Sequence, residues 1–182
     1  MNTYYSYQEL ISLGLKIVGE DVRISKKASI YSPELLTLGN HVRIDDFTIL
    51  SGKISLGDYV HISAFSAIFG RFGVRIGNFC GLSPRSTIFS ASDDFSGNYL
   101  VSPLVPNDFS RLESGEVVLE DYCQLGTNST VMPRITLHEG TVLGAYSFLK
   151  NTTDAWSIYA GIPAKFLRTR NKRAKLLGSK LL

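Results

Sequence analysis

Two adjacent carboxylates in this 182-residue chain, Asp93 and Asp94, have types and spacing that could do chemistry. They stand early in a stretch between Ile88 and Leu119 that is rich in acids, prolines and turn-forming residues. An isolated aspartate, with a pKa of about 3.9, is a weaker base than imidazole at about 6.5. Burial and a neighbouring carboxylate can raise the pKa of one member of such a pair. We therefore take Asp94, assisted by Asp93, as a candidate general base or orienting group; two solvated loop carboxylates are the alternative.

The histidines and cysteines are the other candidates. His41, His61 and His138 are spread along the chain, and none lies in the acid-rich stretch. Their placement does not match a cluster of metal ligands, so we expect no metal site. His61 is a second catalytic candidate if it reaches a cleft from a neighbouring subunit. Cys80 and Cys123 are too few for a disulfide framework, and we expect both to fill space in the core.

The C-terminal residues 165–182 are strongly basic. They contain seven of the 19 Lys and Arg residues and no acid, whereas residues 1–164 carry 12 basic and 16 acidic residues. Such an end can cradle a small polyanion or contact a membrane surface or a nucleic acid, and a solvated tail is the plain alternative. Because Phe166 is the only aromatic residue among these charges, we expect no nucleic-acid binding.

A six-residue period must position these groups. An aliphatic side chain recurs at every sixth position, with slips and one long interruption, as in Leu38, Ile44, Leu50, Leu56, Ile62 and Ile68, or Leu119, Leu125, Val131, Leu137, Leu143 and Leu149. Small or β-branched residues follow four positions later, and Gly often comes directly after the aliphatic residue, where we expect unusual backbone torsions. This period does not keep to one face of a helix. Since six residues suit a short strand plus a corner, we predict an all-β molecule of stacked parallel coils.

The remaining sequence fits one domain with short appendages. Residues 1–17 contain Ser6-Tyr7-Gln8-Glu9, a capping-box spacing, so we predict a short helix that caps the first coil. We assign residues 18–164 to the repeat domain, 89–117 to a loop projecting from it, and 165–182 to the basic tail. The chain has no signal-peptide pattern and no run of about 18 apolar residues, so we expect a cytoplasmic protein without stable membrane insertion.

The period, together with the motifs IGNFCG, QLGTNSTVMPRITL, VLGAYSFLK and YAGIPAKFLR, resembles the hexapeptide-repeat acyltransferases over roughly residues 18 to 170. The resemblance is strongest to maltose, galactoside and xenobiotic O-acetyltransferases and to enzymes that acetylate surface polysaccharides. It implies a left-handed parallel β-helix, assembly as a homotrimer, and acetyl-CoA as the acyl donor.

The same resemblance implies roles for particular residues. In the family, a histidine at the start of the projecting loop is the general base, and laying SASDDF over that segment puts Asp94 in its place. The positions that match the family's coenzyme A contacts are Thr127, Gly144, Ala145, Lys150, Gly161, Pro163, Lys165 and Arg168. The small residues would admit the pantetheine close to the backbone, and the cations would bind the phosphates.

We therefore expect an acetyl-CoA-dependent O-acetyltransferase that acts on a sugar hydroxyl, galactoside-like or in a surface-polysaccharide precursor, by direct transfer in a ternary complex. A primary amine needs no strong base once a neutral fraction is available, so the missing loop histidine keeps N-acetylation of an amino sugar or nucleotide-amino sugar open. A third alternative is a catalytically inactive β-helix that binds coenzyme A or partners.

Overall fold

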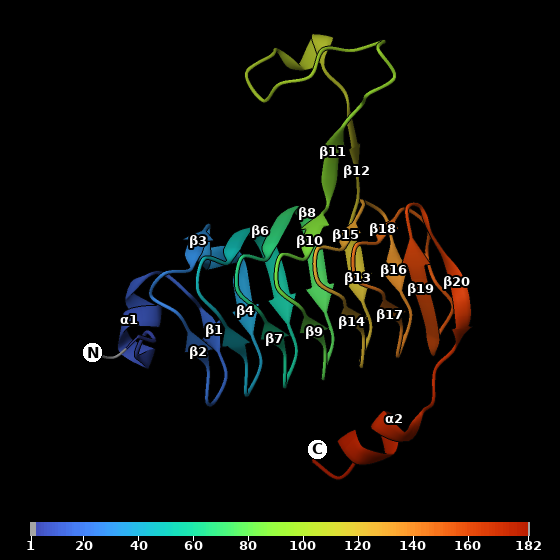
Figure 1. Ribbon diagram of the computed structural model, residues 1–182. Coiled ribbons are helices and arrows are strands. Elements are labelled where there is room, and N and C mark those ends of the chain that lie inside the picture. Colours follow the sequence, from blue (N-terminus) through green and yellow to red (C-terminus); the bar gives the residue numbers. More distant parts are fainter. Residues whose placement is uncertain (1–2, 182) are drawn as a thin grey trace.

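The computed structural model describes residues 3–181 and has the predicted all-β architecture, in which short strands wind into stacked parallel coils (Figure 1). Each coil has three sides, which we call faces A, B and C in chain order. Face A contains β1 (Ile17–Val18), β4 (Leu36–Leu38), the second half of β6 (Ile49–Leu56), the second half of β8 (Ala67–Ile76), β13 (Val117–Leu119) and β16 (Thr136–Leu137).

The other two faces follow the same parallel pairing. Face B contains β2 (Arg23–Ile24), β5 (Arg43–Ile44), β7 (His61–Ile62), β9 (Gly81–Leu82), β14 (Gln124–Leu125), β17 (Val142–Leu143) and β19 (Ser157–Gly161), and it is closed by the antiparallel β20 (Ala164–Thr169). Face C contains β3 (Ser29–Tyr31), the first halves of β6 and β8, β10 (Thr87–Phe89), β15 (Thr130–Val131) and β18 (Phe148–Leu149).

The aliphatic column points into the prism, as the period predicts. Ile24, Ile44 and Ile62, one above the other on face B, are 0% exposed. The column of small residues is buried as well, and its hydroxyls are satisfied by the backbone: Ser86 Oγ donates to the carbonyl oxygen of Ser83 at 2.7 Å. No buried side-chain nitrogen or oxygen in the described residues lacks a hydrogen-bond partner. This satisfaction removes the desolvation cost that buried polar groups otherwise carry.

The two cysteines occupy the small-residue column and are buried without a disulfide. Hydrogen bonding with Cys123, together with burial, raises the pKa of the Cys80 thiol well above its usual range. A thiol kept neutral in this way is unreactive. Their predicted role as buried fillers is confirmed.

At the corners between faces A and B, the unusual backbone torsions that we expected at glycine occur at other residues. The left-handed backbone conformation falls on bulky residues, with φ of 56° at His41, 57° at Tyr59 and 56° at Phe79. Their rings stack at centroid distances of 4.6 and 5.0 Å, and this stacking offsets the backbone strain. Glycine is needed just before these residues for a different reason, because a Cβ on Gly39 would lie 2.7 Å from the carbonyl carbon of Gly57 in the next coil.

The N-terminal helix α1 (Tyr7–Ser12) begins with the predicted capping box. Ser6 Oγ accepts a hydrogen bond from the backbone N–H of Glu9 at 3.3 Å, and Glu9 Oε2 accepts one from the backbone N–H of Ser6 at 2.7 Å. Leu10 is buried in the same core as the first coils, so the helix caps the open end of the prism. A 3-10 helix, η1 (Pro33–Leu35), forms the following corner between faces C and A.

The basic C-terminal segment is a strand followed by a helix. The predicted boundary between repeat domain and tail falls inside β20, and the division of the chain into these units stays a prediction. The helix α2 (Arg173–Gly178) follows, fastened by Arg170, which donates to the carbonyl oxygens of Tyr122 at 2.7 Å and Gly140 at 2.9 Å, and by an ion pair of 2.8 Å between Lys175 and Glu139. None of the helices within residues 3–181 is long and apolar enough to cross a membrane.

The predicted loop stands away from the coils on an antiparallel stalk of β11 (Ala91–Asp93) and β12 (Leu112–Ser114), with η2 (Asn107–Phe109) near its far end (Figure 1). Buried Ser90 anchors the stalk, because its Oγ donates to the carbonyl oxygen of Phe69 at 2.8 Å and accepts from the N–H of Phe72 at 2.9 Å. Apolar side chains of the loop are left uncovered, Leu104 at 92% and Phe95 at 79% exposed.

Candidate active site

Asp94 lies just beyond β11, where the stalk opens into the loop. Its Oδ1 accepts a hydrogen bond from the backbone N–H of Ser96 at 2.7 Å. Hydrogen bonds from Ser96, with the nearby charge of Arg111, hold the pKa of Asp94 below its usual range. Asp94 is therefore not a member of the pair whose pKa burial and a neighbouring carboxylate raise, because local donors stabilise its carboxylate.

Asp93 ends β11 and lines a pocket of about 450 Å³ under the loop. This loop pocket is also lined by Arg71, from the corner between faces C and A, and by Ser102, Asn107 and Ser110 from the loop. Its volume lies within the range of small-ligand sites, about 300–1,000 Å³. Asp93, at the start of the predicted functional loop, thus borders a pocket large enough for a small ligand.

His61 belongs to a different part of the surface. It projects from β7 on face B, and its Nε2 lies 2.8 Å from Asp45 Oδ2, while Arg43 Nε donates to Asp45 Oδ1 at 2.7 Å. Burial acts to raise the pKa of Asp45, but the hydrogen bonds from His61 and Arg43 outweigh it and lower that pKa. The single chain does not bring His61 to the aspartates of the stalk, so its part in catalysis stays a prediction that requires a neighbouring subunit.

Four of the residues predicted to contact coenzyme A form a column at the corner between faces B and C. Thr127 Oγ1 donates to the carbonyl oxygen of Pro84 at 2.7 Å, and Tyr146, next to Ala145, donates its N–H to the carbonyl oxygen of Thr127 at 2.9 Å. Gly161, on the next level, donates its N–H to Ser147 Oγ at 3.0 Å.

Gly144 belongs to the same column, since it directly precedes Ala145. A side chain has no room there, because a Cβ on Gly144 would lie 2.9 Å from the Cβ of Ala160. The members of the column are small, and Ala145 and Gly161 are exposed, as contact with a pantetheine chain requires.

The other four residues predicted to contact coenzyme A lie outside this column, on neighbouring elements. Pro163 lies at the turn between β19 and β20, Lys165 lies in β20 beside Ala160, and Arg168 lies further along β20 beside Ile158. Lys150 follows β18 at the next corner, between faces C and A. Within the described part of the chain, Lys150, Lys165 and Arg168 are exposed and form no ion pair, so their charges are free for an anion.

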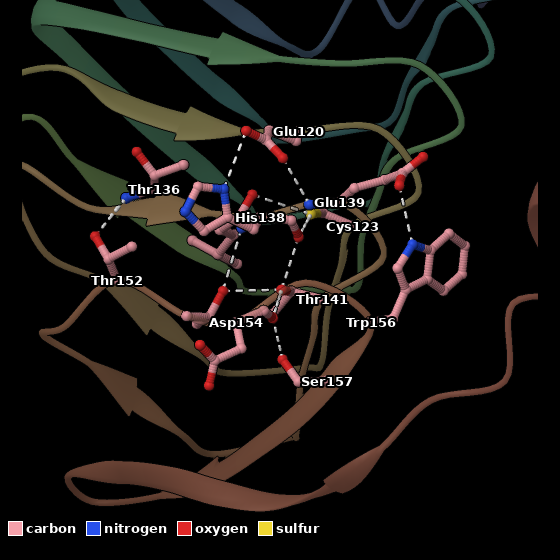
Figure 2. Close-up of polar contacts among 12 residues, drawn as sticks. Glu120, Cys123, Thr136, His138, Glu139, Thr141, Thr152, Asp154, Trp156 and Ser157 are labelled. Carbon is pink, nitrogen blue, oxygen red and sulfur yellow. Dashed lines mark hydrogen bonds and ion pairs between the residues drawn. The ribbon is translucent and has the colours of Figure 1, made fainter.

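A polar network around His138, which sequence reasoning did not single out as a unit, joins the last coils (Figure 2). His138 Nδ1 lies 3.1 Å from Glu120 Oε1, and the N–H of Glu139 donates to Glu120 Oε2 at 2.8 Å. Trp156 Nε1 donates to Glu139 Oε2 at 3.0 Å, and the hydrogen bond from Lys175 lowers the pKa of Glu139. The available signal was the spacing of 18 residues, one full coil, between Glu120 and His138. These contacts fasten coils to one another and to α2.

Within residues 3–181, no group of three or more His, Cys, Asp or Glu side chains is placed to hold a metal ion.

Comparison with known proteins defines the class. No family model matches the chain. It is 39% identical over 173 residues, 93% of this chain and 90% of the relative, to dTDP-4-amino-4,6-dideoxy-D-glucose acyltransferase of Escherichia coli. It is 31% identical over 158 residues, 84% of this chain and 78% of the relative, to WbbJ of Escherichia coli strain K12, a putative lipopolysaccharide biosynthesis O-acetyl transferase. The chain belongs to the hexapeptide-repeat acyltransferases, and its fold is their left-handed parallel β-helix.

Among solved structures, the chain is similar to a mutant of AntD, an N-acyltransferase from Bacillus cereus, in complex with dTDP-4-amino-4,6-dideoxyglucose and coenzyme A. The TM-score is 0.97 at 40% identity, and the match covers 100% of this chain and 97% of AntD. The prediction of the acyltransferase class from the repeat motifs is confirmed.

Proposed function

We propose that this protein transfers an acyl group from an acyl-coenzyme A to the amino group of a nucleotide-linked amino sugar. The observation that carries the proposal is the identity of about 40%, over nearly the whole chain, to a protein named as an acyltransferase of such a sugar and to AntD, an N-acyltransferase solved in complex with one. The two relatives favour the amine-acceptor alternative over the sugar hydroxyl that we expected first.

The chemistry of the loop agrees with an amine acceptor. The neutral amine attacks the thioester carbonyl, the C–N bond forms as the C–S bond breaks, and coenzyme A leaves as the thiolate. The proton lost by nitrogen goes to solvent or to the thiolate. A carboxylate with a lowered pKa, such as Asp94, is a weak base but a good hydrogen-bond acceptor for the amine. We assign Asp94 the role of orienting that amine, with Asp93 beside it.

A relative draws attention to this pair of aspartates. Solved structures of AntD include its D94A and D94N mutants in complex with dTDP and coenzyme A. AntD thus has a serine at 84 and an aspartate at 94, and this chain has the same two residue types at the same spacing in Ser83 and Asp93.

We place the donor along the column of Thr127, Gly144, Ala145 and Gly161. The backbone N–H groups of Thr127 and Ala145, which donate no hydrogen bond within residues 3–181, would bond the pantetheine amides and the oxyanion that develops on the thioester. Pro163 would shape the turn beside it. The phosphates would meet Lys150, Lys165 and Arg168, whose charges have no partner within residues 3–181.

We further propose that the active form is a homotrimer. The donor column lies on an outer corner of the prism, so a second copy is needed to build the other wall of a groove. The uncovered apolar side chains of the loop, Leu104 and Phe95, offer a surface for such a copy.

Turnover tests the function directly. We expect release of free coenzyme A thiol when the protein is given dTDP-4-amino-4,6-dideoxyglucose with acetyl-CoA or 3-hydroxybutyryl-CoA, and a product that carries the acyl group on nitrogen by mass spectrometry. The first donor comes from our sequence expectation and the second from AntD, which has been solved with 3-hydroxybutyryl-CoA. Binding of coenzyme A without any thiol release would support the inactive-scaffold alternative instead.

A second candidate is O-acetylation of a sugar hydroxyl, which the similarity to WbbJ favours. A panel of non-amino sugars and nucleotide sugars separates the two. If acetyl-CoA is consumed with these acceptors and not with the amino sugar, the O-acetyl candidate replaces our proposal.

A further inference from the structure

The loop pocket contains polar groups that the fold itself does not use. Within residues 3–181, the guanidinium of Arg71, the side-chain amide of Asn107 and the hydroxyl of Ser110 have no hydrogen-bond partner, and Arg71 forms no ion pair. The guanidinium carbon of Arg71 lies 5.5 Å from the centroid of the Phe72 ring. A planar cation beside two uncommitted polar side chains suits the oxygens of a phosphate group.

A larger pocket on face A, of about 600 Å³, lacks these properties. It is lined by three carboxylates, Glu120, Asp121 and Glu139, and its arginine, Arg75, already forms two hydrogen bonds with Glu116, at 3.0 and 3.3 Å. An anionic ligand would meet repulsion there. The loop pocket is therefore the better place for a diphosphate.

We infer that the loop pocket binds the diphosphate of the acceptor, with Arg71 as its counter-ion and Asn107 and Ser110 as hydrogen-bond donors. This inference rests on the proposed function, which supplies a nucleoside diphosphate sugar as the acceptor. Asp93 lines the same pocket and repels phosphate, so the diphosphate lies toward Arg71 and the sugar toward Asp93. That orientation points the amino group of the sugar at Asp93, which precedes Asp94 in the chain.

Calorimetric titration of the full-length protein with dTDP tests the inference without requiring turnover. We expect Arg71→Ala to weaken dTDP binding by about tenfold or more, the loss of a charge-assisted contact, and Arg71→Lys to recover part of it. Coenzyme A, titrated into the same variants, should bind as in the wild type. In turnover assays Arg71→Ala should raise KM for the dTDP-linked sugar and leave KM for the acyl-CoA unchanged.

Arg23→Ala is the matched control, because Arg23 is an exposed arginine on β2, in the first coil and paired with Asp21. It should leave dTDP binding unchanged. If Arg71→Ala binds dTDP as the wild type does, or if it weakens coenzyme A instead, the assignment of the pocket is overturned while the proposed function stands. If the wild-type protein neither binds dTDP nor acylates the dTDP-linked sugar, the proposed function fails and the inference falls with it.

Discussion

At the scale of single residues, the environment of Asp94 decides which reactions the loop can support. The backbone N–H of Ser96 and the charge of Arg111 both stabilise the carboxylate, so Asp94 stays ionised at neutral pH. A residue of this kind cannot compete with imidazole as a proton acceptor from a sugar hydroxyl. It can hold an amine in place, because hydrogen bonds to a charged oxygen are short and strong.

Substitution of this carboxylate should therefore affect orientation more than proton transfer. We expect Asp94→Asn to lower kcat by roughly tenfold to a hundredfold, the cost of a misplaced nucleophile, and to leave the dissociation constant of coenzyme A unchanged. Thiol-release assays measure kcat, and calorimetry measures the dissociation constant of coenzyme A.

The pH profile separates the two roles of Asp94. Because its pKa is lowered, it is already charged throughout the neutral range, and the rise of the rate with pH should follow deprotonation of the substrate amine. Asp94→Asn should then reduce the rate at every pH without moving the midpoint of that rise. A profile that loses its rising limb in the variant would mean that Asp94 is a general base after all.

At the scale of elements, α1 shows how a short helix can be held at the end of a prism. A six-residue helix is too short to be stable alone, so its stability comes from its cap, from the burial of Leu10 and from an ion pair of 2.6 Å between Glu9 and Lys26 of the first coil. The hydrogen bond from Lys26, followed by those from Ser6, lowers the pKa of Glu9 to about 2.

This low pKa makes the attachment of α1 sensitive to acid. The contribution of Glu9 to stability is fully present above its ordinary pKa of 4.5 and is lost as the pH falls through about 2. Carboxyl-carbon NMR should give a Glu9 pKa of about 2 in the wild type, and Lys26→Ala should move it back toward 4.5. An unchanged pKa in that variant would show that Lys26 does not hold the helix.

The elements also show what sequence could and could not predict. The interior position of Ile44 follows from the period alone, because the period fixes which side chain of each strand points inward. The capping box at Ser6 and the interruption after Ile88 are local patterns and were predictable for that reason. The pairing of Glu120 with His138 depends on coils stacking in exact register, and the fastening of α2 by Arg170 depends on a chain reversal. Neither is encoded in a local pattern.

At the scale of the whole molecule, the loop and α2 stand on opposite sides of the coils (Figure 1). If the loop packs on a neighbouring copy in the proposed trimer, its most exposed apolar side chain, Leu104, should lie at the contact. We expect Leu104→Asp to dissociate the trimer, measured by light scattering coupled to gel filtration. Leu176→Asp, at a 68% exposed leucine of α2, is the matched control and should leave the mass unchanged.

A monomeric mass for the wild type, or a trimer that survives Leu104→Asp, would contradict this role of the loop. The donor site gives a second readout, because a groove completed by a neighbour should lose affinity for coenzyme A when the copies separate.

The antiparallel turn from β19 to β20 has a consequence for polymerisation. A stack of parallel coils exposes a ready template at each end, and two such ends can join into fibres. Here the strand that covers face B at the C-terminal end runs against the direction of the coils and carries Lys165 and Arg168, so an incoming end meets the wrong polarity and a positive charge. Removal of residues 164–169 should leave β19 open to pairing with another copy, which light scattering would detect as association.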